Sequence, residues 1–151
     1  MTSKTLTFFL VDDDIDDVSL FQEMLTEVDP SIKFTHANDG QEALDQLLSK
    51  STKPDLIFLD LNMPRMDGKQ CLKLIKQAEL LKEIPVIMYT TSSRSQDIEE
   101  TMLHGAVCFI TKPSSIRELE SILTSIAESM PEELEDALRY LSNNANTFIV
   151  C

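Results

Sequence analysis

Short apolar runs alternate with amphipathic stretches along the first 130 residues of the chain. The runs are TFFLV (7–11), IKFTHA (32–37), LIFLD (56–60), PVIMYT (85–90) and VCFIT (107–111). Between them apolar residues recur every three or four positions, as at Ile15, Val18 and Phe21, and this spacing predicts helices. Strands that alternate with helices form βαβ units. The pattern therefore predicts an α/β fold with a mostly parallel sheet covered on both faces.

A further amphipathic stretch follows Pro131. The segment EELEDALRYL places apolar side chains at Leu134, Leu138 and Leu141, which predicts one more helix, and NNANTFIVC reads as a loop with a short apolar end. We expect one domain over residues 1–130, with a C-terminal helical extension over 131–151 and no separate effector domain. Three roles are open for the extension: packing on the domain, covering an output surface, or forming a homodimer.

The charge of the chain limits its partners. Asp and Glu number 26 against 13 Lys and Arg, which gives a net charge of −13. A nucleic-acid surface needs clustered Lys and Arg, and an anionic membrane attracts the same residues. We therefore expect neither nucleic acid nor a membrane as a partner.

The cysteines indicate the compartment. Cys71, Cys108 and Cys151 show neither CxxC spacing nor a matching His pair, so a zinc site is not expected. An odd, sparse count fits a reduced cytosol better than a disulfide scaffold. The apolar run before the first acids is too short for a signal peptide. We expect a cytoplasmic protein.

Polar residues that can carry chemistry stand where the predicted strands end. Asp12 and Asp13 follow the first run, Asp60 ends the third, Thr90 ends the fourth and Lys112 follows the fifth. The carboxyl ends of strands in an open parallel sheet meet along one rim, where ligands bind. Three carboxylates with open positions suit Mg²⁺, which is usually completed by phosphate oxygens. Asp60 would then be a nucleophile for a phosphoryl group that Lys112 and Thr90 hold.

The same residues lie in four motifs that resemble a known family. VDDD (11–14), LDLNMPRMDG (59–68), MYTTS (88–92) and ITKP (110–113) make the chain similar to the receiver domain of bacterial two-component response regulators, over roughly residues 5–129. The resemblance implies a flavodoxin-like, doubly wound parallel sheet of strand order 2-1-3-4-5, here with an extra C-terminal helix. The residues after 130 are too few for a DNA-binding module, so we expect a stand-alone regulator that controls a protein partner or passes a phosphoryl group onward.

Receiver chemistry carries over to matching residues. The resemblance implies that Asp60 accepts a phosphoryl group from the phosphohistidine of a sensor histidine kinase. It implies that Mg²⁺ is bound by Asp13, Asp60 and the backbone carbonyl of Asn62, with Asp12 acting mostly through a bound water. The chain would be a phosphoryl acceptor that loses the group slowly, not an enzyme that turns over a substrate.

The resemblance also implies a switch. Thr90 and Lys112 would contact the phosphoryl group, and the Lys112–Pro113 peptide bond would be cis. Thr90 would move toward the phosphoryl group while Phe109 turns inward behind it. The face made by the fourth helix, the fifth strand and the fifth helix would then present a changed surface to a downstream protein. Phe109 lacks the hydroxyl of the commoner Tyr, and Ser114 stands where a bulky apolar residue is frequent.

Two other functions and some plainer roles compete with these assignments. A Mg²⁺-dependent phosphatase with an Asp nucleophile would need a second Asp at position 62, where Asn62 stands, and a degenerate receiver would act without phosphorylation. Asp14, Asp16 and Asp17 would cap and charge the first turn of a helix. His36 and His104 are expected to be structural or surface residues.

Overall fold

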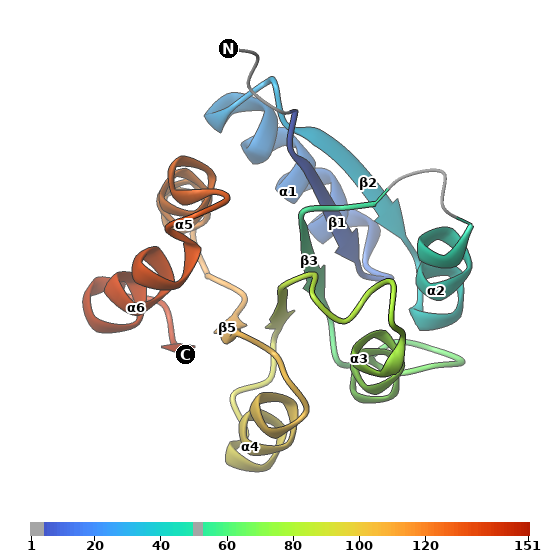
Figure 1. Cartoon of the computed structure of the whole chain (residues 1–151). Helices are drawn as coiled ribbons and strands as arrows, with labels where there is room; N and C mark the ends of the chain where they lie inside the picture. The colour runs from blue at the N-terminus through green and yellow to red at the C-terminus, as the bar shows by residue number, and fades with distance from the viewer. Residues whose placement is uncertain (1–4, 50–52) are drawn as a thin grey trace.

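The sheet has the predicted order and one additional strand. The computed structural model describes residues 5–49 and 53–151. Within these residues the strands are β1 (Thr7–Val11), β2 (Lys33–Ala37), β3 (Leu56–Leu59), β4 (Val86–Thr90), β5 (Cys108–Thr111) and β6 (Ile149–Val150). They lie in the order β2-β1-β3-β4-β5-β6, and only β6 is antiparallel to its neighbour among them (Figure 1). The predicted flavodoxin-like α/β fold is confirmed.

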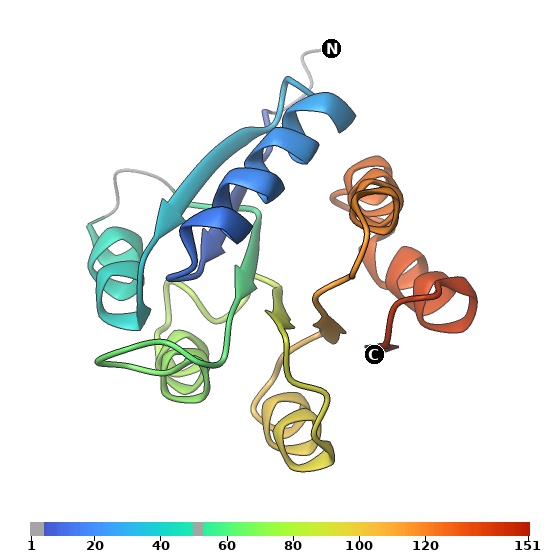
Figure 2. The same ribbon diagram turned by 180° about the vertical axis from the view of Figure 1, so that it is seen from behind.

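Helices cover both faces of this sheet (Figures 1 and 2). One face packs against α1 (Ile15–Val28) and α5 (Ile116–Ser129), with α6 (Leu134–Asn144) beside α5. The other face packs against α2 (Gly40–Leu48), α3 (Gly68–Gln77) and α4 (Ser95–Leu103). This two-sided cover is why the strands read as continuous apolar runs.

Alternate side chains of strand β1 face the two opposite helical layers. Phe8 and Leu10 point into the cluster under α1 and α5, while Phe9 and Val11 point into the cluster under α2 and α3. All four side chains are at most 2% exposed. Burying each of them fully stabilises the fold by about 1.5–3 kcal/mol. The central strands therefore hold the rim residues that follow them in fixed positions.

The C-terminal extension packs on the domain. The predicted helix is present as α6, and Leu134, Leu138 and Leu141 are buried in the same cluster as α5. The tail was expected to be a loop with an apolar end, and that was wrong: Ile149 and Val150 form β6 on the free edge of β5. A strand of two residues is too short to show the alternation that identifies strands. The domain boundary at residue 130 stays a prediction.

Two cysteines also differ from expectation. Cys108 in β5 and Cys151 after β6 are joined by a disulfide, so the expectation that no disulfide is present was wrong. Cys71 is free and buried. The pairing depends on the register between β5 and β6, which spacing along the chain does not reveal.

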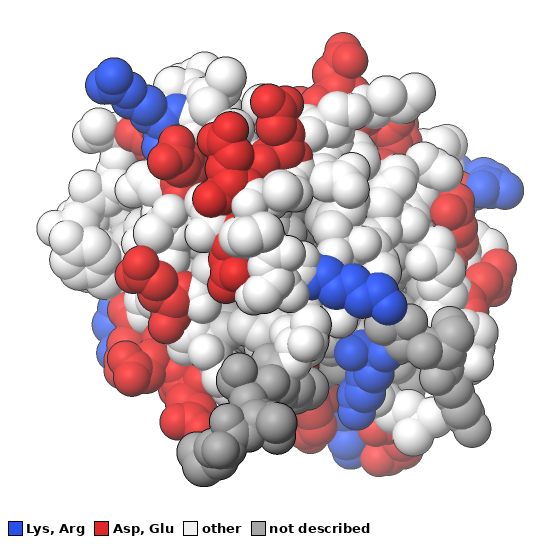
Figure 3. All heavy atoms as spheres, turned by 90° about the horizontal axis from the view of Figure 1, so that it is seen from above, with Lys and Arg blue, Asp and Glu red and all other residues white. Residues whose placement is uncertain are grey.

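Two observations concern nucleic acid and membranes as partners: the charge on one face of the molecule and the length of the helices. On the face at the amino-terminal ends of the strands, acidic side chains are spread widely and basic ones are scattered (Figure 3). None of the described helices is long and apolar enough to cross a membrane.

Candidate functional site

Three of the predicted residues are fixed to the carboxyl-terminal rim of the sheet by their own backbones. Asp12, Asp60 and Lys112 each directly follow a strand. Each donates its N–H to the carbonyl of the last residue of a neighbouring strand, at 3.0, 3.0 and 2.7 Å respectively. The ladder of the sheet thus extends one residue beyond each strand, and the three side chains project at one rim.

The acids form a close group. Carboxylate oxygens of Asp12, Asp13 and Asp60 all lie within 4.8 Å of one another. Asp12 is fully buried, Asp60 is 6% exposed and Asp13 is exposed. Two such charges repel by about 3 kcal/mol at an effective dielectric constant of 20. The arrangement therefore requires a positive charge close by.

Lys112 supplies part of that charge. Its ammonium lies 2.8 Å from Asp12 Oδ2, 2.7 Å from Asp17 Oδ2 and 3.4 Å from Asp60 Oδ2. The predictions placed Lys112 at this rim but gave Asp17 only a role in the first turn of α1. Side chains at the start of a helix tilt toward its N-terminus, and α1 begins at the rim. That geometry is the signal by which Asp17 could have been assigned to the site.

Burial and charge perturb the pKa values of this cluster. Burial raises the pKa of the Asp12 carboxyl, although the Lys112 ammonium and the Asp14 N–H act in the opposite direction. Burial alone would lower the pKa of the Lys112 ammonium, but the close contacts with the Asp12 and Asp17 carboxylates outweigh burial and the pKa is raised. The Lys112 ammonium also lies 5.8 Å from the centre of the Tyr89 ring. Lys112 is therefore charged at neutral pH.

The cluster retains capacity for a cation. The Lys112 ammonium contacts the carboxylates of Asp12, Asp17 and Asp60, and a fourth carboxylate, that of Asp13, lies close to Asp12 and Asp60, so negative charge is in excess. Asp12 Oδ2 is buried and, within the described part of the chain, accepts no hydrogen bond of good geometry; its contact is the ion pair with Lys112. Hard oxygen ligands in excess of positive charge fit a divalent cation such as Mg²⁺ or Mn²⁺.

The remaining predicted site residues are Thr90, Asn62 and Phe109. Thr90 is fully buried at the end of β4, and its hydroxyl accepts a weak hydrogen bond from the Ser92 N–H at 3.4 Å. Asn62 lies two residues beyond Asp60 and is exposed, and its role as a carbonyl ligand stays a prediction. Phe109 is fully buried in the cluster that also includes Val150 of β6. The extension therefore lies against the predicted switch residue.

The prediction of a cis bond between Lys112 and Pro113 was wrong. Among the described residues, the cis peptide bond is Met130–Pro131. The expectation came from the family motif alone and not from any feature of the flanking sequence.

A network around the buried Asp97, which the motifs did not identify, holds the loop after β4. Asp97 in α4 accepts a hydrogen bond from the Ser92 hydroxyl at 2.6 Å and pairs with Lys69 at 2.8 Å and Arg94 at 3.1 Å. The hydrogen bond from Arg94, and then that from Lys69, hold the pKa of the Asp97 carboxyl well below its usual range against the effect of burial. Because Ser92 is two residues beyond Thr90, this network positions the rim of β4.

Gly68 allows the loop after β3 to fold back. Its N–H donates to the Leu61 carbonyl at 2.8 Å, and a Cβ on Gly68 would lie 2.1 Å from the Asp60 carbonyl oxygen. No side chain fits between the start of α3 and the backbone of Asp60. This glycine therefore helps to fix where Asp60 sits.

The plainer assignments are confirmed for one acid and both histidines. Asp14 is the N-cap of α1 and accepts hydrogen bonds from the N–H groups of Asp16 and Asp17. His36 contacts the Asp12 carbonyl at 2.9 Å, and His104 contacts the Glu100 carbonyl at 2.6 Å. Both rings therefore bind their own backbone surroundings.

Comparison with known proteins identifies the family. The model of the response regulator receiver domain matches residues 8–124. The chain belongs to the response regulator receiver family. Response regulator Rcp1 of Synechocystis sp. is 34% identical over 122 residues, which cover 78% of this chain and 83% of Rcp1. A protein-glutamate methylesterase/protein-glutamine glutaminase of Methanospirillum hungatei is also 34% identical, but the match covers only 32% of that longer protein.

Solved structures of the family have the same fold. The phosphorylated cyanobacterial phytochrome response regulator RcpA superposes with a TM-score of 0.79 at 34% identity, covering 85% of this chain and 96% of RcpA. The Mn²⁺-bound form of Rcp1 superposes with a TM-score of 0.74 at 33% identity, covering 83% of this chain and 93% of Rcp1. This receiver is thus similar to proteins whose structures were solved phosphorylated and with a divalent metal.

Proposed function

We propose that this receiver is a phosphorylatable switch in which Asp60 accepts a phosphoryl group from the phosphohistidine of a sensor histidine kinase. A carboxylate oxygen of Asp60 forms the new bond to phosphorus, and the bond from phosphorus to the histidine nitrogen breaks. The chain then acts by protein contact, on a downstream protein or a phosphotransfer partner, and loses the group slowly by hydrolysis.

The observation that carries this proposal is the contact of one ammonium with three carboxylates at the rim. Lys112 lies 3.4 Å from Asp60 Oδ2, so it can pair with a phosphoryl oxygen on Asp60 after a small movement. Thr90 lies at the end of β4, beside β3. Within the described residues its hydroxyl accepts one weak hydrogen bond, from the Ser92 N–H, and is available to donate to a second phosphoryl oxygen. Positioning and charge neutralisation are what phosphoryl transfer mainly needs.

Mg²⁺ is the proposed cofactor. Asp12, Asp13 and Asp60, with the carbonyl of Asn62, would hold it. When bound, it would offset the charge of the acids and of the incoming phosphoryl oxygens. The Mn²⁺-bound structure of Rcp1 supports a divalent ion in this family, and we infer Mg²⁺ from the preference of that ion for carboxylate and phosphate oxygens.

A cytoplasmic location and a protein output follow from the same proposal. A kinase that donates from phosphohistidine meets its receiver in the cytoplasm. The similarity to RcpA, a cyanobacterial phytochrome response regulator, makes phytochrome-type sensors the class of kinase to test first. The proposed output surface is α4-β5-α5, with Thr90 and Phe109 as the switch. Self-association through the same region is a second form of output.

Phosphoramidate tests the proposal directly because its P–N bond resembles that of phosphohistidine. The purified protein is incubated with phosphoramidate, with Mg²⁺ or with a chelator, and its intact mass is measured. We expect the mass of one phosphoryl group to be added only with Mg²⁺, and nothing to be added to Asp60→Asn. Asp16→Asn is the matched control: Asp16 is an exposed acid near the rim that contacts neither Lys112 nor Asp60 in the structure.

The proposal fails if Asp60→Asn takes up phosphate as fast as the wild type. It also fails if the wild type takes up none from phosphoramidate, acetyl phosphate or a phosphorylated kinase. Continuous release of phosphate from a small phosphate ester would instead favour a phosphatase.

A further inference from the structure

The disulfide partners are brought together by strand pairing and not by sequence proximity. Ile110 of β5 is the register partner of Ile149 in β6, so antiparallel pairing places Cys108 opposite Cys151 two residues further along. Their Cα atoms are 4.2 Å apart and their sulfur atoms are bonded. Directly opposite residues on an antiparallel pair approach to about this distance where they do not share ladder hydrogen bonds.

The three cysteines differ in access. Cys108 is fully buried, whereas Cys151 is exposed. Burial raises the pKa of the Cys71 thiol to about 12, so this thiol is protonated and inert at neutral pH. A small reagent in solution therefore meets Cys151 first, and Cys108 can be oxidised only through Cys151.

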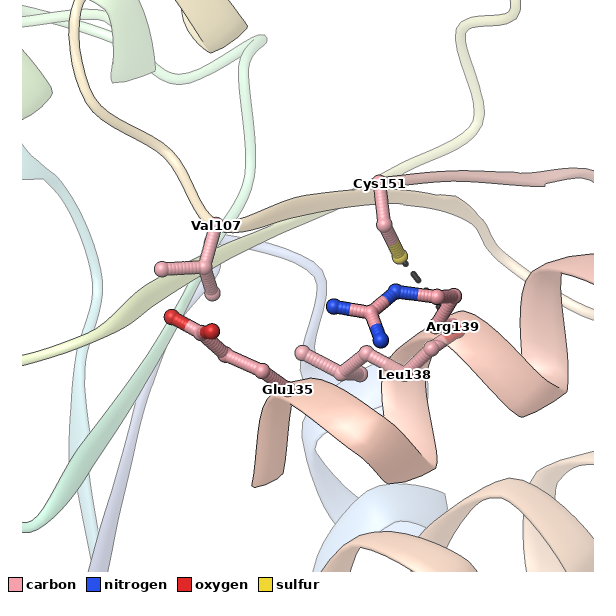
Figure 4. Close-up of a pocket in the computed structure, with 5 residues that line it drawn as sticks. All are labelled: Val107, Glu135, Leu138, Arg139 and Cys151. Atoms are coloured by element: carbon pink, nitrogen blue, oxygen red, sulfur yellow. Dashed lines mark hydrogen bonds between the residues drawn. The ribbon is translucent and has the colours of Figure 1, made fainter. Parts of the chain in front are cut away.

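A pocket borders the exposed cysteine (Figure 4). It has a volume of about 210 Å³ and is lined by Val107, Glu135, Leu138, Arg139 and Cys151. Arg139 extends from α6 on the side of the pocket near the sulfur, and Glu135 extends from the same helix toward Val107, so the pocket has one positive and one negative group. Cys151 Sγ also lies 3.4 Å from the Leu138 carbonyl oxygen, to which a reduced thiol can donate. The site thus accommodates the thiol in its reduced form as well as the disulfide.

We propose that Cys108 and Cys151 form a reversible redox site that reacts with low-molecular-weight disulfides bearing carboxylate and amino groups. The Cys151 thiolate attacks the small disulfide, forms a mixed disulfide and releases one small thiol. Cys108 then passes its proton to the released small thiolate, and the Cys108 thiolate attacks the Cys151 sulfur. This step releases the second small thiolate, which takes up from solvent the proton that Cys151 had lost. Two protein thiols and one small disulfide thus give one protein disulfide and two small thiols.

Arg139 is assigned to bind a carboxylate of the small disulfide, and Glu135 to bind its amino group. Arg139 is two-thirds exposed and pairs with Asp136 at 3.4 Å, an ion pair that an incoming carboxylate can replace at little cost.

The Cys108–Cys151 disulfide fixes β6 on the edge of β5, close to the proposed switch residue Phe109. In the oxidised form β6 is held covalently against β5, where Val150 packs in the same cluster as Phe109. In the reduced form the tail is held on β5 only by non-covalent contacts. These are the pairing of Ile149 and Val150 with β5 and the hydrogen bond from the Thr111 N–H to the Phe148 carbonyl at 3.0 Å. Cytosolic disulfides are usually transient and redox-sensing, which fits a bond that can open. The redox site goes beyond the proposed function, and its test needs no phosphorylation.

The test uses the full chain, reduced and freed of reductant, with oxidised glutathione as the carboxylate-bearing disulfide and cystamine as a disulfide that has amino groups only. Intact mass and peptide mapping follow the thiols. We expect the loss of two hydrogen atoms, a Cys108–Cys151 peptide, and slower amide exchange at Thr111. Cys151→Ser should not form the bond, and Cys71→Ala should form it as the wild type does. Arg139→Gln should slow the reaction with oxidised glutathione by up to about fivefold and leave cystamine unaffected.

Three results would overturn the proposal. The first is a lasting glutathione adduct with no internal bond. The second is a disulfide that involves Cys71 or joins two copies of the chain. The third is equal exchange at Thr111 in the oxidised and reduced forms. Because phosphoryl uptake is measured as a separate mass change, failure here leaves the proposed function to stand or fall on its own test.

Discussion

Replacing Asp12 by Asn should stabilise the metal-free protein. Asp12 is fully buried, 2.8 Å from the Lys112 ammonium and within 4.8 Å of two other carboxylates. At an effective dielectric constant of 20 the attraction is about 6 kcal/mol and each repulsion about 3 kcal/mol. These charge interactions nearly cancel, so the burial cost of the carboxylate, several kcal/mol before other contacts, is left without a matching gain.

We expect Asp12→Asn to raise the free energy of unfolding by about 1–2 kcal/mol when a chelator removes divalent metal. The gain is less than the full burial cost because the new amide nitrogen can face the Lys112 ammonium. Asn keeps the shape of the side chain and can still accept the hydrogen bond from the Asp14 N–H, which is 2.9 Å long in the wild type. The measurement is urea unfolding followed by circular dichroism.

Added Mg²⁺ should reverse the order of the two proteins. At a concentration one hundred times its dissociation constant, a ligand that binds only the folded state stabilises it by about 2.7 kcal/mol. The wild type should show that gain, and Asp12→Asn should show much less. Asp16→Asn removes an exposed acid and should stay within about 0.5 kcal/mol of the wild type in both conditions. If Asp12→Asn were less stable than the wild type in chelator, the claim that the metal-free rim carries an excess of negative charge would be wrong.

Further predictions concern the support of the site. A Cβ at Gly68 would lie 2.1 Å from the Asp60 carbonyl oxygen, so Gly68→Ala should lower stability by about 1–3 kcal/mol in thermal unfolding and slow phosphoryl uptake; wild-type values for both would contradict this packing argument. The pKa of Asp97 is lowered in the folded protein, so the stability that Asp97 contributes is present above the ordinary value of 3.8 and is lost as pH falls through the lower folded pKa. Asp97→Asn should therefore cost about 3 kcal/mol at pH 7 and progressively less below about pH 4 in urea titrations, and a constant difference would count against the ion pairs. Asp13 is exposed but lies within 4.8 Å of the buried Asp12, so Asp13→Asn should raise metal-free stability by about 1 kcal/mol, because it removes a repulsion that solvent partly screens. It should also weaken Mg²⁺ binding in calorimetric titration, and unchanged affinity would remove Asp13 as a ligand.

The fold was predictable because burial on both faces marks the strands of a parallel sheet. Runs such as LIFL at 56–59 contain no polar position, and Asp60, Asp12 and Lys112 could be placed on one rim because the carboxyl ends of parallel strands meet there. That inference needs only the order of the elements, and the structure brings these three side chains into contact.

The features that were missed depend on contacts that span the chain. Asp17 reaches Lys112 across 95 positions, and Asp97 of α4 pairs with Lys69 of α3. Strand β6 has two residues, and its pairing with β5 sets the Cys108–Cys151 bond. No local pattern encodes such contacts, because they arise from packing and register.

The measurement that tests the central claim most directly is the position of the phosphoryl group. The protein is phosphorylated with phosphoramidate and Mg²⁺, reduced with borohydride and digested, since borohydride converts an aspartyl phosphate into homoserine. The account predicts homoserine at position 60 and at no other aspartate. Homoserine at another aspartate such as Asp12 or Asp13, or a phosphoryl group that resists borohydride because it sits on a serine or threonine, would contradict it.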